Sequence, residues 1–301
     1  MRPRPVPRRS RTRGAPAAGS ASAVTTPVGS PLVRASATTW IFPDGPPSSR
    51  RDCDTAAVAD EAGYFGERVA ARYDDHSWSM FDPAVVGPAV DLLAELAGGG
   101  RALEFAIGTG RIALPLAERG VPVAGIDSSE AMLARLREKP GGERVEAMAG
   151  DMATTRVEGE FALVFLVFNT IFNLTTQDGQ VACFENAAAH LARGGRFVIE
   201  ARVPELQRLP LGQTVLPWRA DPGGYSAYVY DVVTQRLSGQ HYYIEEERIR
   251  ASPTEMRYAW PSELDLMARL AGMRLEHRWA GWRGEPFMAL SPAHVSVYAK
   301  T

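Results

Sequence analysis

The stretch that decides the fold reads LEFAIGTG and spans residues 103–110. It begins as an apolar strand, turns at two glycines and leads into a predicted helix at Ile112–Arg119. A strand, a glycine turn and a helix together expose backbone N–H groups and a helix N-terminus to a ligand. Gly108 and Gly110 carry no Cβ, so a ligand can come close to the backbone there. The stretch therefore predicts a ligand-binding turn at the end of a strand.

The spacing of the glycines also fits the dinucleotide fingerprint G-x-G-x-x-A, with Ala113 as its last position. Asp127 closes the next predicted strand, 19 positions after Gly108. A carboxylate at that place can accept hydrogen bonds from ribose hydroxyls. The turn alone therefore leaves open whether the chain is an NAD(P)-dependent oxidoreductase or a non-catalytic protein that binds a nucleoside.

Glu104 argues against the first of these alternatives. It lies inside an apolar strand, four residues before Gly108. A buried carboxylate is costly unless a positive partner compensates it. A ligand that carries an ammonium and a sulfonium would supply positive charge, whereas the pyrophosphate of NAD would be repelled. We therefore expect a cationic ligand beside this turn.

Two further segments follow predicted strands. Gly150-Asp151-Met152 follows the third strand, where a carboxylate and a thioether could bracket an adenine; the alternative is a turn with a core methionine. Phe168, Asn169 and Asn173 follow the fourth strand. Amides at the carboxyl edge of a parallel sheet can meet a cofactor or an acceptor, although Asn169 could instead cap a helix.

Strands and helices alternate along most of the chain. The predicted strands are Ala102–Ile107, Val121–Ile126, Val145–Ala149, Phe161–Phe168, Arg196–Glu200, Arg274–Trp282 and His294–Ala299. The predicted helices are Ala59–Arg72, Pro83–Leu96, Ile112–Arg119, Ser129–Lys139, Asp178–Arg193 and Ser262–Gly272. Their expected N-caps are Asp82, Ser128 or Ser129, and a capping box that begins at Ser262. Apolar strands separated by helices indicate an α/β fold with a mostly parallel seven-stranded sheet covered on both faces.

Residues 203–260 break this rhythm and predict an antiparallel β insertion. Its expected strands are Ser226–Val233, His241–Ile244 and Met256–Trp260. Alternation puts Tyr228 and Tyr230 on one face. Aromatic residues favour strands whatever their function, so sheet packing is one interpretation. The other is a lid over the acceptor, where an amine would suit aromatic rings through cation–π contact.

Charge divides the chain into two parts. Residues 1–50 carry eight Arg and one Asp, whereas the remainder holds 25 basic and 34 acidic side chains. The first part lacks apolar periodicity and predicts a disordered tail, which leaves residues 51–301 as the folded domain. An acidic body argues against nucleic acid as the main partner. No apolar run reaches the roughly 18–20 residues of a membrane span.

The two cysteines, Cys53 and Cys183, are far apart. They form neither a metal-type spacing nor a disulfide framework, so we expect no metal site. A reducing, cytoplasmic setting is the default for such a chain.

The motifs taken together resemble those of the class I methyltransferases. The resemblance rests on residues 103–110, Gly125–Leu133, Gly150–Met152 and Leu191–Glu200. It is greatest for small-molecule members, including the N-methyltransferases of amino sugars and natural products. It implies a Rossmann-like domain with S-adenosylmethionine as cofactor and an amine or hydroxyl of a small molecule as acceptor. The implied core is 65–202 with 261–301, the implied substrate lid is 203–260, and a monomer or homodimer is expected.

The resemblance also implies roles for the matching positions. Gly108 and Gly110 would line the methionine part of the cofactor, Asp127 would bind ribose, and Phe168 would lie near the sulfonium. The implied cofactor site comprises Tyr73, Glu104, Ala106, Gly108, Thr109, Gly110, Asp127, Ser128, Met132, Asp151, Met152 and Phe168. The acceptor would meet Asn169, Asn173, Tyr228 and Tyr230. Asn173 stands where some sugar N-methyltransferases carry a histidine, so the resemblance does not assign the acceptor of those enzymes to this chain.

Methyl transfer needs a general base only if the nucleophile arrives protonated. The candidates are Tyr73, His76, His241 and Glu200. His76 follows Tyr73 by three residues, so a helix would put both on one face. Histidine is the side chain best suited to proton transfer near neutrality, yet no spacing singles out one of the four.

Overall fold

The computed structural model describes residues 65–76, 80–245 and 248–301. The predicted tail at residues 1–50 lies outside the described residues, as does the start of the first predicted helix at residues 59–64. Within the described ranges, no helix is long and apolar enough to cross a membrane.

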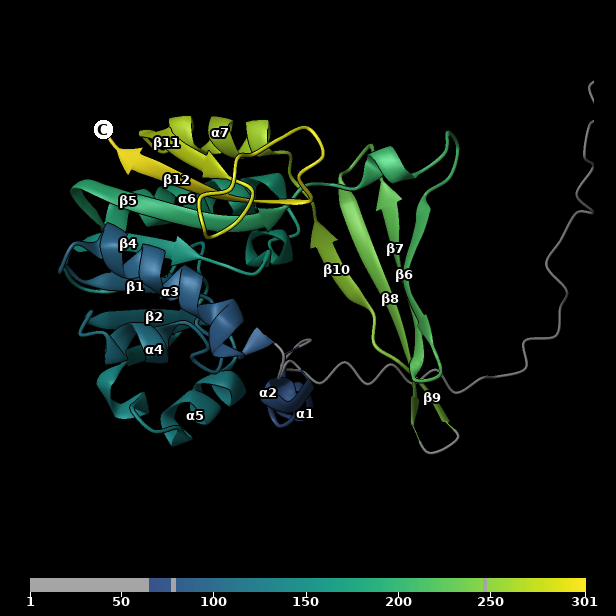
Figure 1. Ribbon diagram of the computed structural model, residues 1–301, viewed down its shortest axis with the longest axis horizontal. Helices are drawn as coiled ribbons and strands as arrows, with labels where there is room; N and C mark the ends of the chain where they lie inside the picture. Colours follow the sequence, from purple (N-terminus) through teal and green to yellow (C-terminus); the bar gives the residue numbers. More distant parts are fainter. Residues whose placement is uncertain (1–64, 77–79, 246–247) are drawn as a thin grey trace, which may run out of the picture. The chain divides into compact units, whose positions relative to one another are not determined.

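A seven-stranded sheet forms the centre of the domain (Figure 1). Its strands are β1 (Ala102–Phe105), β2 (Val123–Asp127), β3 (Glu146–Ala149), β4 (Phe161–Leu166), β5 (Leu191–Arg202), β11 (Met273–Trp279) and β12 (Ala293–Lys300). They lie in the order β11-β12-β5-β4-β1-β2-β3. Strands β1 to β5 pair in parallel, while β12 pairs antiparallel with both β5 and β11. The predicted mostly parallel, Rossmann-like sheet is therefore confirmed.

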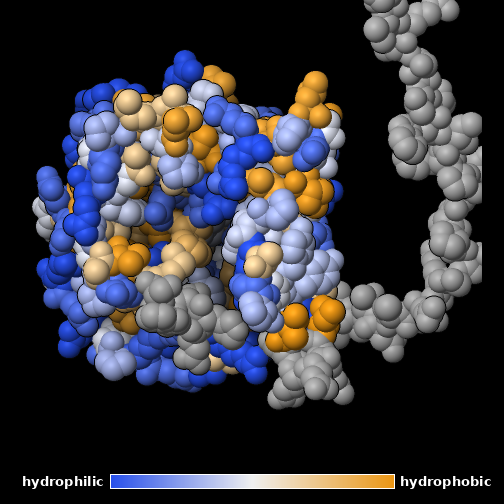
Figure 2. Space-filling model, turned by 45° about the vertical axis from the view of Figure 1, so that its right-hand side comes forward, coloured by the Kyte–Doolittle hydropathy of each residue, from blue (hydrophilic) through white to orange (hydrophobic). Residues whose placement is uncertain are grey.

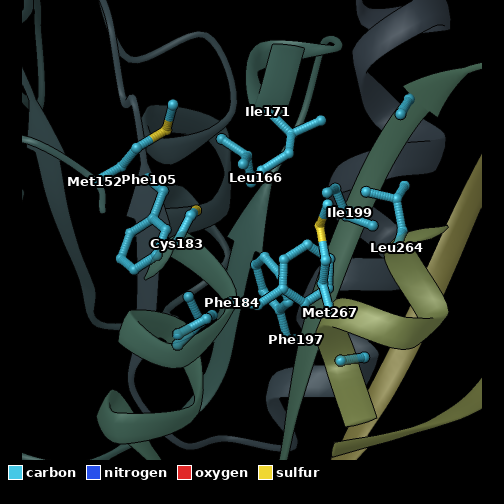
Figure 3. Close-up of a cluster of buried hydrophobic side chains, with 14 of the residues drawn as sticks. Phe105, Met152, Leu166, Ile171, Cys183, Phe184, Phe197, Ile199, Leu264 and Met267 are labelled. Carbon is cyan, nitrogen blue, oxygen red and sulfur yellow. The ribbon is translucent and has the colours of Figure 1, made fainter. Parts of the chain in front are cut away.

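Helices cover both faces of this sheet, as predicted (Figure 1). One face carries α3 (Pro83–Ala97), α4 (Ala113–Glu118) and α5 (Glu130–Glu138), and the other carries α6 (Gln177–His190) and α7 (Pro261–Leu270). On the second face Phe184 of α6 meets Phe197 of β5 edge to face, with ring centres 5.1 Å apart, and Met267 of α7 lies beside them (Figure 3). Each such buried side chain stabilises the fold by about 1.5–3 kcal/mol.

Two of the three predicted helix caps are confirmed and the third is wrong. Asp82 caps α3 by accepting from the Ala84 N–H at 2.8 Å, and Ser129 caps α5 by accepting from Met132 at 3.2 Å, as predicted. The capping box at Ser262 is wrong. Helix α7 already begins at Pro261, with Trp260 as N-cap and no side-chain cap, and Asp265, the acidic residue of the expected box, pairs instead with Arg278 at 2.5 Å.

Several predicted boundaries are also wrong: β1 ends at Phe105 rather than Ile107, β5 begins at Leu191 rather than Arg196, β11 ends at Trp279 rather than Trp282, and the strands expected at Ser226–Val233 and Met256–Trp260 each begin and end two or three residues earlier than expected. Three further differences have a clear cause. The first helix is broken into α1 (Glu67–Ala70) and α2 (Tyr73–His76) by a turn. Helix α6 ends at His190 rather than Arg193, because Leu191 already pairs with Phe161 of the neighbouring strand. Strand β4 ends at Leu166 rather than Phe168, because Phe168 has a positive φ that no strand can continue.

The insertion forms an antiparallel sheet of its own, as predicted (Figure 1). It contains β6 (Val215–Asp221), β7 (Gly224–Asp231), β8 (Arg236–Glu245), β9 (Arg248–Ala251) and β10 (Thr254–Arg257). Strands β6 and β9 were not predicted. Leu216, Tyr230 and Leu237 lie on one face of the sheet and belong to the core cluster of the α6–α7 side. The two sheets therefore share a hydrophobic core.

Arg257, 5% exposed, anchors this second sheet. Its guanidinium donates to the Gln180 amide oxygen of α6 at 2.6 Å, to Glu263 of α7 at 2.7 Å and to Gln235 at 2.9 Å. Away from this anchor the surface is hollowed between the two sheets (Figure 2).

Candidate active site

The turn after β1 presents backbone to the site. Gly108 and Gly110 adopt left-handed φ angles of 57° and 82°. A Cβ on Gly108 would point into open space, whereas one on Gly110 would lie 3.0 Å from Leu114 Cγ. Gly110 is therefore required for packing, and Gly108 leaves room for a ligand. Ala106 shares the left-handed region at φ 53°, which costs an L-residue about 1–2 kcal/mol.

Glu104 of β1 is buried, with 2% of its surface exposed. Its Oε2 atom has no hydrogen-bond partner among the described residues. Burial raises the pKa of this carboxyl well above its ordinary value; the Arg111 charge opposes the rise and the Asp127 carboxylate adds to it. A buried oxygen without a partner is costly, so a cationic ligand group at this place would be stabilising.

Asp127, at the end of β2, is fixed by two backbone groups. Its Oδ2 accepts from the Gly108 N–H at 2.7 Å, and its Oδ1 accepts from the Ser129 N–H at 2.8 Å. Burial raises the pKa of this carboxyl, and the two hydrogen bonds lower it. Next to it Ser128 is exposed, while Met132 is buried on α5. The first two strand ends are thus tied together at the carboxyl edge of the sheet.

The third strand end holds Asp151 and Met152. Asp151 accepts from the Ala153 N–H at 2.8 Å and remains exposed, whereas Met152 is 9% exposed. Asn186 of α6, which the sequence analysis did not single out, donates to the carbonyls of Met152 and Thr155 at 2.8 and 3.0 Å. This buried amide therefore sets the path of the segment. No local pattern marks it, because both partners lie more than 30 positions away.

The segment at residues 65–76 is bound to the glycine turn at residues 108–110 by Asp74. The Thr109 hydroxyl donates to Asp74 at 2.7 Å, and the Lys139 ammonium lies 2.5 Å from the other carboxylate oxygen. Lys139 also donates to the Thr109 carbonyl at 2.8 Å. Tyr73, one of the implied cofactor residues, stands edge-on to the Phe65 ring, with ring centres 6.4 Å apart. The side chain of His76 lies outside the described residues.

Phe168 and Asn169 follow β4, and both have a φ of 63°. The Phe168 ring is 38% exposed, and the Arg111 guanidinium lies 5.1 Å from its centre. The Asn169 side-chain oxygen accepts from the Arg202 N–H at 2.6 Å, which engages it with backbone. Asn169 precedes a short 3-10 turn without making a side-chain cap, and Asn173 at the end of that turn is exposed.

The antiparallel sheet brings an aromatic group to this edge. Tyr228 and Trp218 stack with ring centres 5.9 Å apart, and His241 stands edge-on to both. The Arg202 guanidinium, at the end of β5, lies 5.4 Å from the centre of the Tyr228 ring. Tyr230 differs from Tyr228, because it is 2% exposed and packs on Tyr258 in the core.

His241 is buried on β8, with 9% of its surface exposed. Burial lowers the pKa of its imidazole. Its Nε2 faces the Thr254 hydroxyl at 3.3 Å, and its Nδ1 is buried with no partner among the described residues. The ring is therefore neutral near pH 7 and enclosed by its aromatic neighbours.

The predicted cofactor residues thus gather at the carboxyl ends of β1 to β4, and the acceptor candidates divide between that edge and the second sheet. Within the described part of the chain, no group of three or more His, Cys, Asp or Glu could hold a metal ion.

Known proteins resemble this chain in both sequence and fold. A family profile described as "Methyltransferase domain" matches residues 102–195. The structure of the CcbJ methyltransferase from Streptomyces caelestis is 37% identical, with 80% of this chain and 100% of that chain covered and a TM-score of 0.71. The cypemycin N-terminal methyltransferase of a Streptomyces species is 27% identical over 239 residues, which are 73% of this chain and 94% of that protein.

A third relative shares the fold. The S-adenosylmethionine-bound structure of CalS10, an amino pentose methyltransferase from Micromonospora echinaspora involved in calicheamicin biosynthesis, is 24% identical, with a TM-score of 0.56. The match covers 77% of this chain and 95% of that chain.

Proposed function

The chain belongs to the class I S-adenosylmethionine-dependent methyltransferases, and from that premise we propose that it methylates an amine of a small-molecule natural product, with a hydroxyl as the second possibility. The names of two relatives support an amine, since one is an N-terminal methyltransferase and the other an amino pentose methyltransferase. An amine that arrives protonated would also suit the aromatic rings around Tyr228 through cation–π contact, and the neutral imidazole of His241 would not repel its charge.

One observation supports the assignment of the cofactor site. The unpartnered Glu104 oxygen lies in the strand that leads to the open face of Gly108. Positive charge there would be stabilised by the carboxylate, whereas a pyrophosphate would be repelled, so the residues fit S-adenosylmethionine and not NAD. The oxidoreductase alternative is therefore not favoured.

S-adenosylmethionine supplies a methyl group that the positive sulfur has already activated. The task left to the protein is alignment and exclusion of water, which can contribute up to about 7–11 kcal/mol in well-oriented systems. We assign cofactor binding to the residues that the resemblance implies, which are Tyr73, Glu104, Ala106, Gly108, Thr109, Gly110, Asp127, Ser128, Met132, Asp151, Met152 and Phe168. Asp127 would meet ribose with lone pairs that its two backbone donors leave free.

The acceptor would lie between Phe168 and the inner face of the 203–260 sheet, the proposed substrate lid. Support comes from the contact between Arg202 and Tyr228, which joins the end of β5 to that face. Tyr228 is the better candidate of the two tyrosines, because Tyr230 is occupied with core packing. Asn169 would have to act through its amide nitrogen, and Asn173 is exposed on the same connection.

Tyr73, His76, His241 and Glu200 remain the candidates for a general base. Burial lowers the pKa of the His241 imidazole and so favours the neutral form that a general base requires. The ring is buried, however, so the lid would have to open before His241 could accept a proton from the acceptor. A cytoplasmic location and a monomeric or dimeric state also remain predictions.

The test has two steps. Calorimetry should show binding of S-adenosylhomocysteine and none of NADH. Incubation with S-adenosylmethionine and a library of amine and hydroxyl metabolites, followed by mass spectrometry, should then reveal a product that has gained one methyl group. Binding of NADH alone would overturn the cofactor assignment, and methylation of hydroxyls only would overturn the amine assignment.

A further inference from the structure

Two successive residues at the site hold a backbone conformation that is unusual for L-amino acids. Phe168 and Asn169 both have a φ of 63°, and glycine is at neither position. Asparagine adopts this conformation readily, but for a bulky residue such as Phe168 it costs about 1–3 kcal/mol and persists only where the surroundings fix it. The contacts that fix this pair are therefore informative about what the pair does.

The end of β5 supplies those contacts. The Glu200 carboxylate accepts from the Phe168 N–H at 2.8 Å through Oε2, and the Glu200 carbonyl accepts from the Asn169 N–H at 3.1 Å. The Arg202 N–H donates to the Asn169 side chain at 2.6 Å. We call this group of three hydrogen bonds the β5 clasp. It holds the main chain on both sides of the Phe168 Cα.

A fourth contact orients the carboxylate itself. The Trp282 indole N–H donates to Glu200 Oε1 at 2.9 Å. Both oxygens of Glu200 are thus engaged by fixed donors on opposite sides. This arrangement suits a carboxylate that holds its neighbours in place, and it is unfavourable for one that must turn toward a substrate and take up a proton.

The clasp acts on Phe168, a large apolar side chain that is 38% exposed at the site. With its backbone held, the Phe168 ring lies against the Arg111 guanidinium at 5.1 Å. The same strand end carries the Arg202 side chain, which contacts the Tyr228 ring of the second sheet. One short segment of β5 therefore fixes both the ring proposed to lie near the sulfonium and the surface proposed to bind the acceptor.

We infer that Glu200 is a positioning residue for methyl transfer: through the β5 clasp it holds the Phe168 ring in the alignment that the reaction requires. The inference rests on the proposed function, because it presumes that Phe168 faces the reacting methyl. It also removes Glu200 from the candidates for a general base.

The experiment compares Glu200→Ala, Glu200→Gln and Trp282→Phe with the wild-type enzyme, using the acceptor found in the screen. Glutamine keeps an oxygen for the Phe168 N–H, whereas alanine keeps none. Misplacement by about 1 Å can cost 100-fold in rate, so we expect kcat to fall roughly 10- to 100-fold in Glu200→Ala. Glu200→Gln and Trp282→Phe should lie between that variant and the wild type. The dissociation constant of S-adenosylhomocysteine should stay within about threefold.

Glu276→Gln is the matched control, because it makes the same change on β11, where the carboxylate pairs with Arg196 at 2.7 Å outside the site. It should leave kcat unchanged. The pH–rate profile of Glu200→Gln should keep the shape of the wild-type profile.

Loss of activity in Glu200→Gln equal to that in Glu200→Ala, with an altered pH profile, would overturn the inference in favour of a general base. Equal losses of kcat, ligand affinity and melting temperature would overturn it in favour of a purely structural role. If Glu200→Ala does not fold, Trp282→Phe decides, since it removes one hydrogen bond only, and unchanged kcat in that variant would refute the inference. Failure of the proposed function differs from all of these, because the wild-type enzyme itself would then transfer no methyl group.

Discussion

Asp74 and Thr109 are joined by a hydrogen bond of 2.7 Å across 35 positions of sequence. Through it, and through Lys139, the segment at residues 65–76 is bound to the glycine turn at residues 108–110. Asp74→Ala removes both contacts, and a hydrogen bond is worth about 0.5–1.5 kcal/mol net. We expect S-adenosylhomocysteine to bind about three- to tenfold more weakly by calorimetry. Global melting should change little, because a short segment can open locally.

Glu138→Ala is the control for this prediction, since it breaks the exposed pair with Arg135 on the same side of the domain. Equal weakening in both variants would show that Asp74 has no special role.

Gly108→Ala tests whether the open face of the turn belongs to the ligand. Gly120 has a similar left-handed φ, 84°, and its Cβ would also point into open space, but at the end of α4. Both alanine variants should lose about 1–2 kcal/mol of stability from the left-handed backbone. Only Gly108→Ala should lose ligand affinity, by roughly tenfold or more if the methyl crowds a well-fitted site. Equal affinity in the two variants would contradict the assignment.

Glu104→Gln should improve stability while impairing binding. Burial puts the folded-state pKa of Glu104 above its ordinary value of 4.5. Between these two pKa values the folded protein holds a proton that the unfolded chain has lost, so stability falls as the pH rises. Urea unfolding of the ligand-free variant should therefore give a larger free energy than the wild type at neutral pH, and the difference should vanish below pH 4.5.

The same variant should bind S-adenosylhomocysteine roughly 10- to 100-fold more weakly, since a hydrogen bond to a charged group is worth about 1.5–3 kcal/mol. A variant that binds normally would mean that the ligand ammonium lies elsewhere.

Tyr228→Ala should raise the acceptor KM by about tenfold, within the range of about 0.5–2 kcal/mol for cation–π contacts. The affinity for S-adenosylhomocysteine should not change. Tyr225→Ala is the control, because Tyr225 lies on the opposite face of the same strand, against Tyr242 and Ile244. Tyr230→Ala should instead lower the melting temperature, as expected for a core aromatic. An increase of KM in Tyr225→Ala as large as in Tyr228→Ala would contradict an acceptor surface.

Features with a local cause were predictable from the sequence. The glycine turn, the Asp82 and Ser129 caps and the alternation of strands and helices depend on residues a few positions apart. The sequence therefore predicts these features, and the motifs among them also indicate the family and its cofactor.

Features made by distant partners were not predictable. Asp265 has the spacing of a capping box with Ser262, yet it pairs with Arg278, 13 positions further on. The end of α6 depends on the pairing of Leu191 with another strand. Neither Asp74 nor Glu200 carries a pattern that names its partner 30 or more positions away. The positive φ of Phe168 also depends on distant contacts. The sequence alone therefore predicts Phe168 as the last residue of a strand.

The anchor formed by Arg257 has an evolutionary consequence. It joins one end of the antiparallel sheet to α6 and α7, which contribute nothing to the glycine turn. Trp218 and Tyr228 lie further along the strands and make none of the hydrogen bonds of this anchor, so substitutions there would leave the attachment itself intact. If the antiparallel sheet binds the acceptor as proposed, a lineage that carries this fold would be able to change what it methylates through substitutions in that sheet alone.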